Sequence, residues 1–204
     1  MIIKTPLFIV FEGIDGAGKS TQALRLYNFC NAITPTALLQ EPTQSKHGQT
    51  LRKMLKGEIQ GTTEELLDLF IKDREYDVEH NIQPLLQKGI VVIVDRYFYS
   101  TAAYQATDIV TPDVIVTMNI NKGFPVPNRV YFIDVEPSVA LKRIQNRSGN
   151  NREIFESLHI LEKIRKNYLS LVNDTFAVIK GYNYDEETLF KYVLHDFTQH
   201  FITE

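Results

Sequence analysis

Five short runs of apolar residues recur along the chain and predict buried strands. They cover 7–12, 37–41, 90–95, 130–135 and 176–180, and they are nearly continuous in Val, Ile, Leu and Phe. Strands with this pattern are buried on both faces, as in parallel sheets. Because stretches with helical spacing lie between the strands, the alternation predicts an α/β domain with right-handed crossovers.

The clearest helix is predicted to begin at Thr62 or Thr63, since hydroxyl caps and the acids that follow favour a helix start. Its inner row repeats every four residues and consists of Leu66, Phe70, Arg74, Val78 and Ile82. Further helices are predicted after Pro137, over 154–172 and over 185–201.

The segment 147–152 interrupts this pattern, because it is polar, basic and contains a glycine. It predicts a mobile loop, and we expect it to form a short lid at about 146–153. The chain has 204 residues, which suits one domain over 1–204 with such a lid.

Composition excludes several classes of protein. The net charge is −3, so no general attraction to nucleic acid or membranes is expected, and phosphate binding must come from local basic clusters. The longest aliphatic run, 90–94, is too short to span a membrane, and 7–11 is too short for a secretory leader. The five histidines lack the spacing of a structural zinc site.

A single cysteine, Cys30, excludes an internal disulfide and is typical of a cytoplasmic protein. It shares helical spacing with Ala23, Leu26 and Tyr27, which predicts a buried core thiol rather than a reactive one.

One motif carries specific chemistry. The pattern G-x-x-x-x-G-K-[ST] is filled between an apolar strand and a helical stretch, by Gly13, Ile14, Asp15, Gly16, Ala17, Gly18, Lys19 and Ser20, with Thr21 following. The glycines let backbone N–H groups surround a phosphate, and the new helix directs its positive end at the same anion. Lys19 is expected to bridge the β- and γ-phosphates of ATP, and Ser20 to bind its Mg²⁺.

Two further sites are candidates. Asp95 and Arg96 end a predicted central strand, where a carboxylate lies close to the P-loop Mg²⁺ and an arginine reaches the same cleft. Arg74 lies on an otherwise apolar helix row and therefore needs a partner. That partner is either a substrate phosphate or a nearby acidic residue, and the sequence leaves both alternatives open.

These motifs, taken in order, resemble the thymidylate kinase family over nearly the whole chain. The resemblance lies in 11–21, Glu41-Pro42, Leu69-Phe70, Asp73-Arg74, Asp95-Arg96-Tyr97, Ser100, Ala103-Tyr104-Gln105 and Tyr168-Leu169. It implies a P-loop NTPase domain of three layers, with a five-stranded parallel sheet flanked by helices and a lid. It also implies a homodimer that phosphorylates thymidine monophosphate with ATP and Mg²⁺.

The resemblance implies a role for individual residues. Phe70 would stack on thymine, Arg74 and Gln105 would hold its polar edge and the neighbouring phosphate, and Ser100 would line the base pocket. Arg96 would touch the acceptor phosphate. Asp15 would accept a hydrogen bond from the sugar 3′-hydroxyl, and Tyr104 would lie where a 2′-hydroxyl would go. The P-loop of this chain lacks an arginine among its variable residues, so Arg147 or Arg152 in the lid is expected to reach the phosphates.

Three rival functions remain at this point. A deoxyribonucleoside kinase has a similar P-loop but needs a carboxylate base for its hydroxyl acceptor, whereas Arg74 and Arg96 suit a phosphate. A broader pyrimidine monophosphate kinase is a second alternative. A GTPase-type switch would need an N-K-x-D motif, and the nearest match, 121–124, lacks the acid.

Overall fold

The computed structural model describes residues 1–148, 157–181 and 185–203, except for the side chains of 147 and 148. Its central sheet has five parallel strands in the order β3-β4-β2-β5-β6. Their bounds are β2 (Leu7–Glu12), β3 (Thr36–Gln40), β4 (Val91–Asp95), β5 (Arg129–Asp134) and β6 (Phe176–Lys180). The predicted parallel α/β sheet is confirmed, and each predicted strand is displaced by at most one residue.

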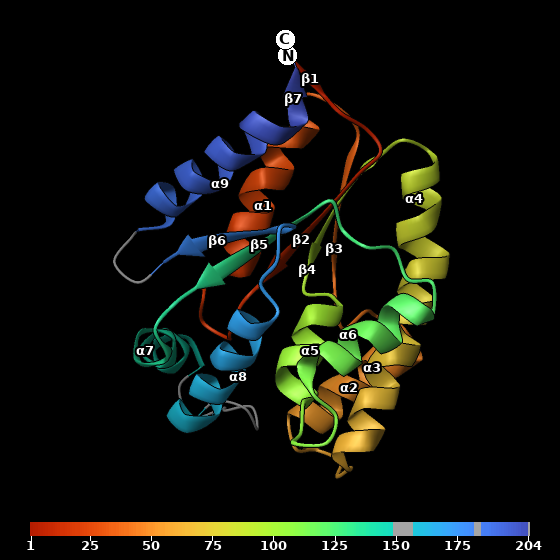
Figure 1. The fold of residues 1–204 in the computed structure, drawn as a ribbon, viewed down its shortest axis with the longest axis vertical. Coiled ribbons are helices and arrows are strands. Elements are labelled where there is room, and N and C mark those ends of the chain that lie inside the picture. Colours follow the sequence, from red (N-terminus) through yellow and green to blue (C-terminus); the bar gives the residue numbers. More distant parts are fainter. Residues whose placement is uncertain (149–156, 182–184, 204) are drawn as a thin grey trace.

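Helices cover both faces of this sheet, as Figure 1 shows. The described residues form the α-helices α1 (Lys19–Asn31), α2 (Lys46–Leu55), α3 (Thr63–Asp77), α4 (Gln83–Gln87), α5 (Phe98–Gln105), α6 (Pro112–Asn121), α7 (Pro137–Ser148), α8 (Leu158–Ser170) and α9 (Glu186–Phe201). Helices α1 and α9 pack against each other on one side, with α1 over β2, β3 and β4. On the other side, α5 packs against α8. A small antiparallel pair, β1 (Ile2–Ile3) and β7 (Ile202–Thr203), joins the two ends of the described chain.

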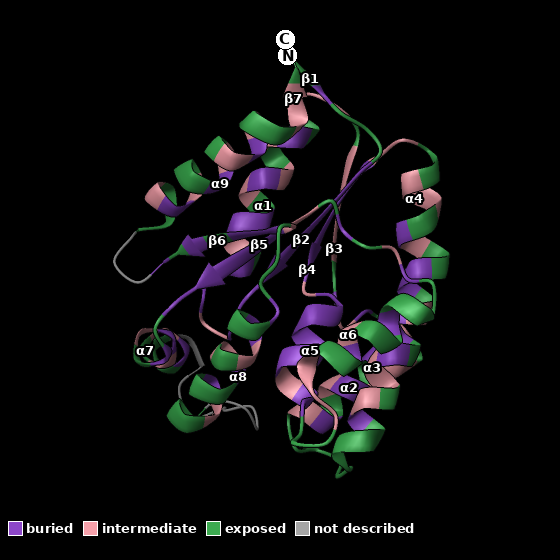
Figure 2. Ribbon diagram, viewed as in Figure 1, coloured by how far each residue is buried: buried purple, intermediate pink, exposed green. Residues whose placement is uncertain are grey.

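The core lies along the strands (Figure 2), where β2 and β4 are buried over their whole length. Burial on both faces explains why their sequences show no alternation of polar and apolar residues. Tyr168 of α8 stacks on Phe132 of β5, with 5.2 Å between ring centroids. Cys30 is fully buried, and burial raises the pKa of its thiol to about 12, which confirms the predicted core thiol.

The predicted helix start at Thr62 is confirmed by a capping box. The Thr62 hydroxyl accepts from the Glu65 backbone N–H at 3.1 Å, and the Glu65 carboxylate accepts from the Thr62 N–H at 2.8 Å. The helix row that was predicted to run to Ile82 is not one α-helix, because a π-helical turn, η1 (Val78–Ile82), follows α3. Pro84 cannot donate to the carbonyl four residues earlier, and a wider turn before it relieves this conflict.

One other boundary differs from the sequence prediction. The helix predicted over 154–172 ends at Ser170, and its expected start lies outside the described residues. Helices α2 and α6 were not predicted. No helix in the described ranges combines the length and the apolar character that crossing a membrane requires.

Candidate active site

The P-loop connects β2 to α1 and takes a conformation that its glycines permit. Gly13 and Gly16 have φ values of 147° and 77°, in the region that side chains rarely adopt. A Cβ at Gly13 would lie 2.6 Å from the Ile133 carbonyl oxygen, and one at Gly16 would lie 2.5 Å from that of Ala140. Both positions therefore require glycine for conformation and for space. The first turn of α1 begins directly after the loop, at Lys19, and faces the cavity described below.

Lys19 and Ser20 lie beside the end of β4. The Lys19 ammonium donates to the Ile14 carbonyl at 2.9 Å, and burial, followed by the charge of Arg96, lowers its pKa to about 8. The Ser20 hydroxyl donates to Oδ2 of Asp95. The other oxygen of that carboxylate, Oδ1, is buried and has no hydrogen-bond partner among the described residues. A hydroxyl and a carboxylate with a free lone pair suit a hydrated Mg²⁺ carried in by a nucleotide.

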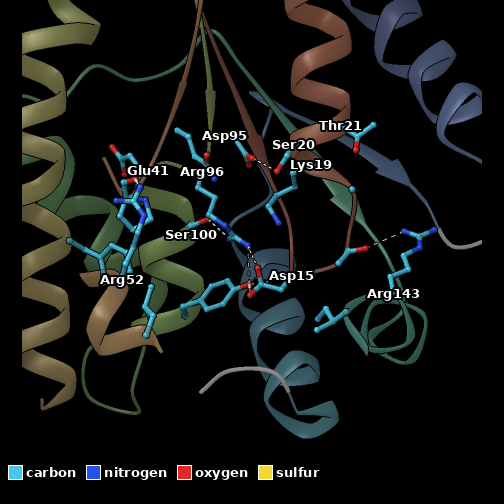
Figure 3. A pocket seen from close by; sticks show the side chains of 18 of the residues that line it. Asp15, Lys19, Ser20, Thr21, Glu41, Arg52, Asp95, Arg96, Ser100 and Arg143 are labelled. Atoms are coloured by element: carbon cyan, nitrogen blue, oxygen red, sulfur yellow. Dashed lines mark hydrogen bonds and ion pairs between the residues drawn. The ribbon is translucent and has the colours of Figure 1, made fainter. Parts of the chain in front are cut away.

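Arg96 follows β4 and reaches the P-loop across the cavity. It has a left-handed backbone, with φ of 71°, so the chain turns sharply where β4 ends. Its guanidinium binds Oδ1 of Asp15 at 2.5 Å and donates to the Ser100 hydroxyl at 2.9 Å. Figure 3 shows Arg96 and Asp15 directed toward one another. Burial alone would raise the pKa of Asp15, but the charges of Arg96 and Lys19 outweigh it and lower that pKa.

A buried ion pair lies behind the loop that follows β3. Arg74 is 1% exposed and binds Oε2 of Glu41 at 2.5 Å. It also donates to Asn119 at 2.8 Å and to Thr101 at 3.0 Å, and its guanidinium lies 5.1 Å from the centre of the Tyr97 ring. Burial raises the pKa of Glu41, while the charge of Arg74 opposes that rise. The sequence left two alternatives for the partner of Arg74, a substrate phosphate or an acidic residue. In the described residues, its charged partner is the acidic residue Glu41.

A cavity of about 410 Å³ lies between the P-loop and the residues that follow β3 and β4. The candidate residues that line it are Asp15, Gly16, Gly18, Lys19, Ser20, Thr21, Phe70, Asp95, Arg96, Ser100 and Tyr104. The side chains of Ile14 and Ala17 are buried in the core instead. Arg74 and Gln105 are buried and do not belong to the lining of this cavity. Arg147 lies at the end of α7 with its side chain undescribed, and Arg152 falls outside the described residues.

Two arginines that the sequence analysis missed line opposite sides of this cavity (Figure 3). Arg52 of α2 donates to the backbone carbonyls of Thr43, at 2.5 Å, and Pro42, and so braces the loop after Glu41. Arg143 of α7 donates to the P-loop carbonyls of Gly16 at 3.3 Å and Ala17 at 3.4 Å. Arg143 precedes the predicted Arg147 by one helical turn, and this spacing was the signal that could have revealed it.

A parallel sheet with a phosphate loop after its central strand, and with cations on both sides of one cavity, defines a P-loop phosphotransferase. The family model "Thymidylate kinase" matches residues 11–189 of this chain. A thymidylate kinase from Leptospira interrogans is 42% identical, over 86% of this chain and 86% of the relative. One from Leptospira borgpetersenii is 38% identical, over 99% of this chain and all of the relative. The solved structure of thymidylate kinase from Candida albicans superposes with a TM-score of 0.79 at 21% identity, covering 98% of this chain and 97% of that one.

The chain belongs to the thymidylate kinase family. It is therefore an ATP-dependent nucleoside monophosphate kinase, and a nucleoside acceptor is not favoured. The structural likeness at 21% identity supports the fold. The incomplete N-K-x-D motif at 121–124 lies at the end of a helix. Its Lys122 is the C-terminal cap of α6 and contacts Glu75 at 3.4 Å.

Proposed function

We propose that this chain transfers the γ-phosphoryl group of Mg²⁺·ATP to the phosphate of dTMP, giving dTDP and ADP. The observation that supports this most directly is the contact between Arg96 and the P-loop. Arg96 binds Asp15 at 2.5 Å and approaches the Gly13 carbonyl at 3.4 Å. A cation suited to the acceptor phosphate thus lies against the loop suited to the donor phosphates, as in-line transfer requires.

The donor side would use the P-loop backbone and four side chains. Lys19 bridges the β- and γ-phosphates and neutralises charge that develops on them. Ser20 and Asp95 would hold Mg²⁺, and the metal would supply charge compensation at the phosphate oxygens. Arg143 lies beside the P-loop carbonyls, where it adds a further positive charge on the donor side.

The acceptor side would hold dTMP against α3 and α5. Phe70 is half-buried in the cavity wall and offers its ring to the base, while Ser100 and Tyr104 line the same wall. Asp15 would accept from the sugar 3′-hydroxyl. Arg74 and Gln105 would hold the base edge from behind this wall. Arg74 reaches the cavity through its bond to Glu41, which lines it.

Transfer between these sides needs no general base. A phosphate oxygen of the acceptor is already an anion at neutral pH, and the transition state of phosphoryl transfer is loose. Catalysis then consists of positioning and of charge compensation. Arg147 or Arg152 would add to the charge compensation by closing over the phosphates. Arg147 lies one helical turn after Arg143 in α7.

We further propose a cytoplasmic homodimer. Exposed apolar side chains are present on neighbouring helices, with Tyr76 of α3 40% exposed and Val114 and Met118 of α6 41% and 39% exposed. The contact between Lys122 and Glu75 shows that these helices lie side by side. The buried free Cys30 supports a reducing compartment.

An ADP-release assay tests the proposed reaction with thymidine, dTMP, dUMP and UMP as acceptors. We expect kcat/KM to be highest for dTMP, with no turnover of thymidine. Phosphorylation of thymidine, or equal use of all three monophosphates, would overturn the assignment in favour of a nucleoside kinase or a general pyrimidine monophosphate kinase.

A further inference from the structure

A fully buried carboxylate lies beneath this site and plays no part in the transfer described above. Glu12 ends β2, directly before Gly13, and its side chain is 0% exposed. Burying a charge without compensation is costly, and here four hydrogen-bond donors converge on one carboxylate. Burial raises the pKa of Glu12, and these donors oppose that rise.

The two oxygens of Glu12 have different kinds of partner. Oε1 accepts from the backbone N–H groups of Tyr97 at 2.9 Å and Ser100 at 3.1 Å. Oε2 accepts from the hydroxyls of Ser100 at 2.5 Å and Tyr168 at 2.9 Å. An ionised carboxylate only accepts hydrogen bonds, so it can accept the hydrogens of both N–H groups and both hydroxyls.

The backbone partners of Oε1 place Glu12 at the start of α5. The N-cap of this helix, Tyr97, provides no side-chain cap, and the Ser100 N–H is shared between Glu12 and the Tyr97 carbonyl, which lies at 3.0 Å. Glu12 supplies the cap from a neighbouring strand. It does so one residue after the left-handed Arg96, whose own N–H donates to the Phe11 carbonyl at 3.0 Å. The end of β2 therefore holds the Arg96 backbone on both sides.

The hydroxyl partners of Oε2 connect Glu12 to the Arg96 side chain. The Ser100 hydroxyl has one hydrogen, and its short bond to Glu12 takes that hydrogen. A lone pair of the same oxygen is then free to accept from the Arg96 guanidinium at 2.9 Å. The Ser100 oxygen also lies 2.8 Å from the Tyr168 hydroxyl, but both hydroxyls donate to the same oxygen of Glu12. Glu12 therefore sets the direction of the Ser100 hydroxyl and, with it, the acceptor for Arg96.

We propose that Glu12 is a positioning residue for phosphoryl transfer, holding Arg96 through the Ser100 hydroxyl and the cap of α5. The inference rests on the proposed function, because it assumes that Arg96 binds the acceptor phosphate. Glu12 acts on the reaction through Arg96 and does not touch the substrates.

The variant Glu12→Gln tests this with little change of shape. An amide has two donor hydrogens on one atom, and these cannot face the Tyr97 and Ser100 N–H groups. The amide nitrogen therefore faces the hydroxyls of Ser100 and Tyr168 and donates a hydrogen to each. Neither hydroxyl can then donate to residue 12. The lone pairs of the two hydroxyl oxygens are too few to accept the amide hydrogens, the Arg96 N–H and both hydroxyl hydrogens. We expect kcat with dTMP to fall about 10- to 100-fold, as for a misplaced catalytic group, with KM for ATP within about two-fold of wild type.

A double-mutant cycle with Arg96→Ala separates positioning from a general loss of structure. If Glu12 acts through Arg96, adding Glu12→Gln to Arg96→Ala lowers kcat no further. Multiplying losses would overturn the proposal, as would an unchanged kcat in Glu12→Gln. Thr62→Ala is the stability control, since it removes the cap of a different helix and should lower Tm without changing kcat per folded molecule.

Two outcomes keep this test distinct from that of the proposed function. A wild-type enzyme inactive on every monophosphate overturns the proposed function itself, whereas an active wild type with an equally active Glu12→Gln overturns only the role of Glu12. If Glu12→Gln does not fold, Glu12→Asp replaces it in the cycle, because it keeps the buried charge but withdraws the carboxylate from Ser100 and the start of α5. Glu12→Asp must then be silent in the Arg96→Ala background, and a further loss of kcat there overturns the proposal.

Discussion

The hydroxyl of Tyr104 bridges the side chain and the backbone of Asp15. It donates to Oδ2 at 2.8 Å and accepts from the Asp15 N–H at 3.0 Å. Tyr104 belongs to α5 and Asp15 to the P-loop, so this bridge fixes the ring between the acceptor side and the donor loop. The guanidinium of Arg96 lies 5.1 Å from the ring centre and restricts the ring further.

A ring fixed in this way is expected to select deoxyribose. A tyrosine against C2′ leaves no room for a hydroxyl, and burying that hydroxyl without a partner adds a further cost. We expect kcat/KM for dUMP to exceed that for UMP by about 10- to 100-fold. Tyr104→Ala should narrow this ratio, mainly by improving UMP. Tyr104→Phe is the matched control, because it keeps the ring and should keep the preference. Equal use of UMP and dUMP by the wild type would show that the ring excludes nothing.

Replacing Lys19 tests the charge on the donor side. Lys19→Ala should fold normally and lose about a hundred-fold or more in kcat, because it removes a charge contact made to the transferring phosphoryl group. Steady-state turnover and a melting curve measured on the same preparation give both quantities. A folded variant with near wild-type turnover would contradict the role of the P-loop in transfer.

The pKa of Lys19, lowered to about 8, predicts an alkaline limb in the pH profile. Below this pKa the ammonium is charged and attracts phosphates, and above it the charge is lost. The kcat/KM for ATP reports the free enzyme, so it should fall as pH rises beyond about 8. Lys19→Arg keeps its charge over this range and should lose the limb. An unchanged limb in that variant would assign it to another group.

The buried pair of Arg74 and Glu41 predicts a large effect on stability. Arg74→Ala leaves the Glu41 carboxylate buried without its cation, which costs about 3–5 kcal/mol in the free energy of unfolding. Urea denaturation measures this, and Arg74→Met with Glu41→Gln should recover much of the loss, since no unpaired charge remains. Should Arg74 also hold the base edge, KM for dTMP rises in the folded variant while ATP binding is unchanged.

Phe70→Ala is the comparison for that kinetic effect. Its ring is half-buried in the cavity wall, so its loss should cost little stability. Base stacking on an aromatic ring is worth about 1–3 kcal/mol, and KM for dTMP should rise accordingly. Unchanged affinity for dTMP in both variants would exclude Arg74 and Phe70 from the acceptor site.

The basic end of α7 predicts a separation between two kinds of arginine. Arg147→Ala with Arg152→Ala should lower kcat by about a thousand-fold, as expected for an arginine finger, with little change in KM for ATP. Arg143→Ala should act mainly on KM for ATP, because Arg143 lies against the P-loop carbonyls. Stopped-flow measurement of the transfer step distinguishes these effects. Unchanged turnover in the double variant would leave the 147–152 segment as a solvated basic loop.

Local features of this protein could be predicted from sequence because they depend on neighbouring residues. The P-loop is contiguous, its glycines are required by their own φ values, and its place between strand and helix is visible in the apolar pattern. The capping box joins Thr62 and Glu65, which are three positions apart, so this helix start was equally accessible. The central strands were predicted because burial on both faces imposes a continuous apolar run.

Contacts between distant residues were decided by the tertiary structure. The order β3-β4-β2-β5-β6 places β4 beside β2, which brings Asp95 to Ser20 and Arg96 to Asp15. Sequence showed that Arg74 needs a partner but left a substrate and an acid equally possible, and only packing selected Glu41 as its contact.

Arg143 and Glu12 show the limit most clearly. Arg143 is one basic residue among several on a polar helix, and its value as a P-loop neighbour depends on where α7 crosses the loop. Glu12 directly precedes the P-loop motif in the sequence. Its four donors, however, come from the start of α5 and from α8, up to 156 residues away. A sequence determines which groups can donate and accept, whereas the packing of strands and helices decides which of them meet, because hydrogen bonds act only over about 3 Å.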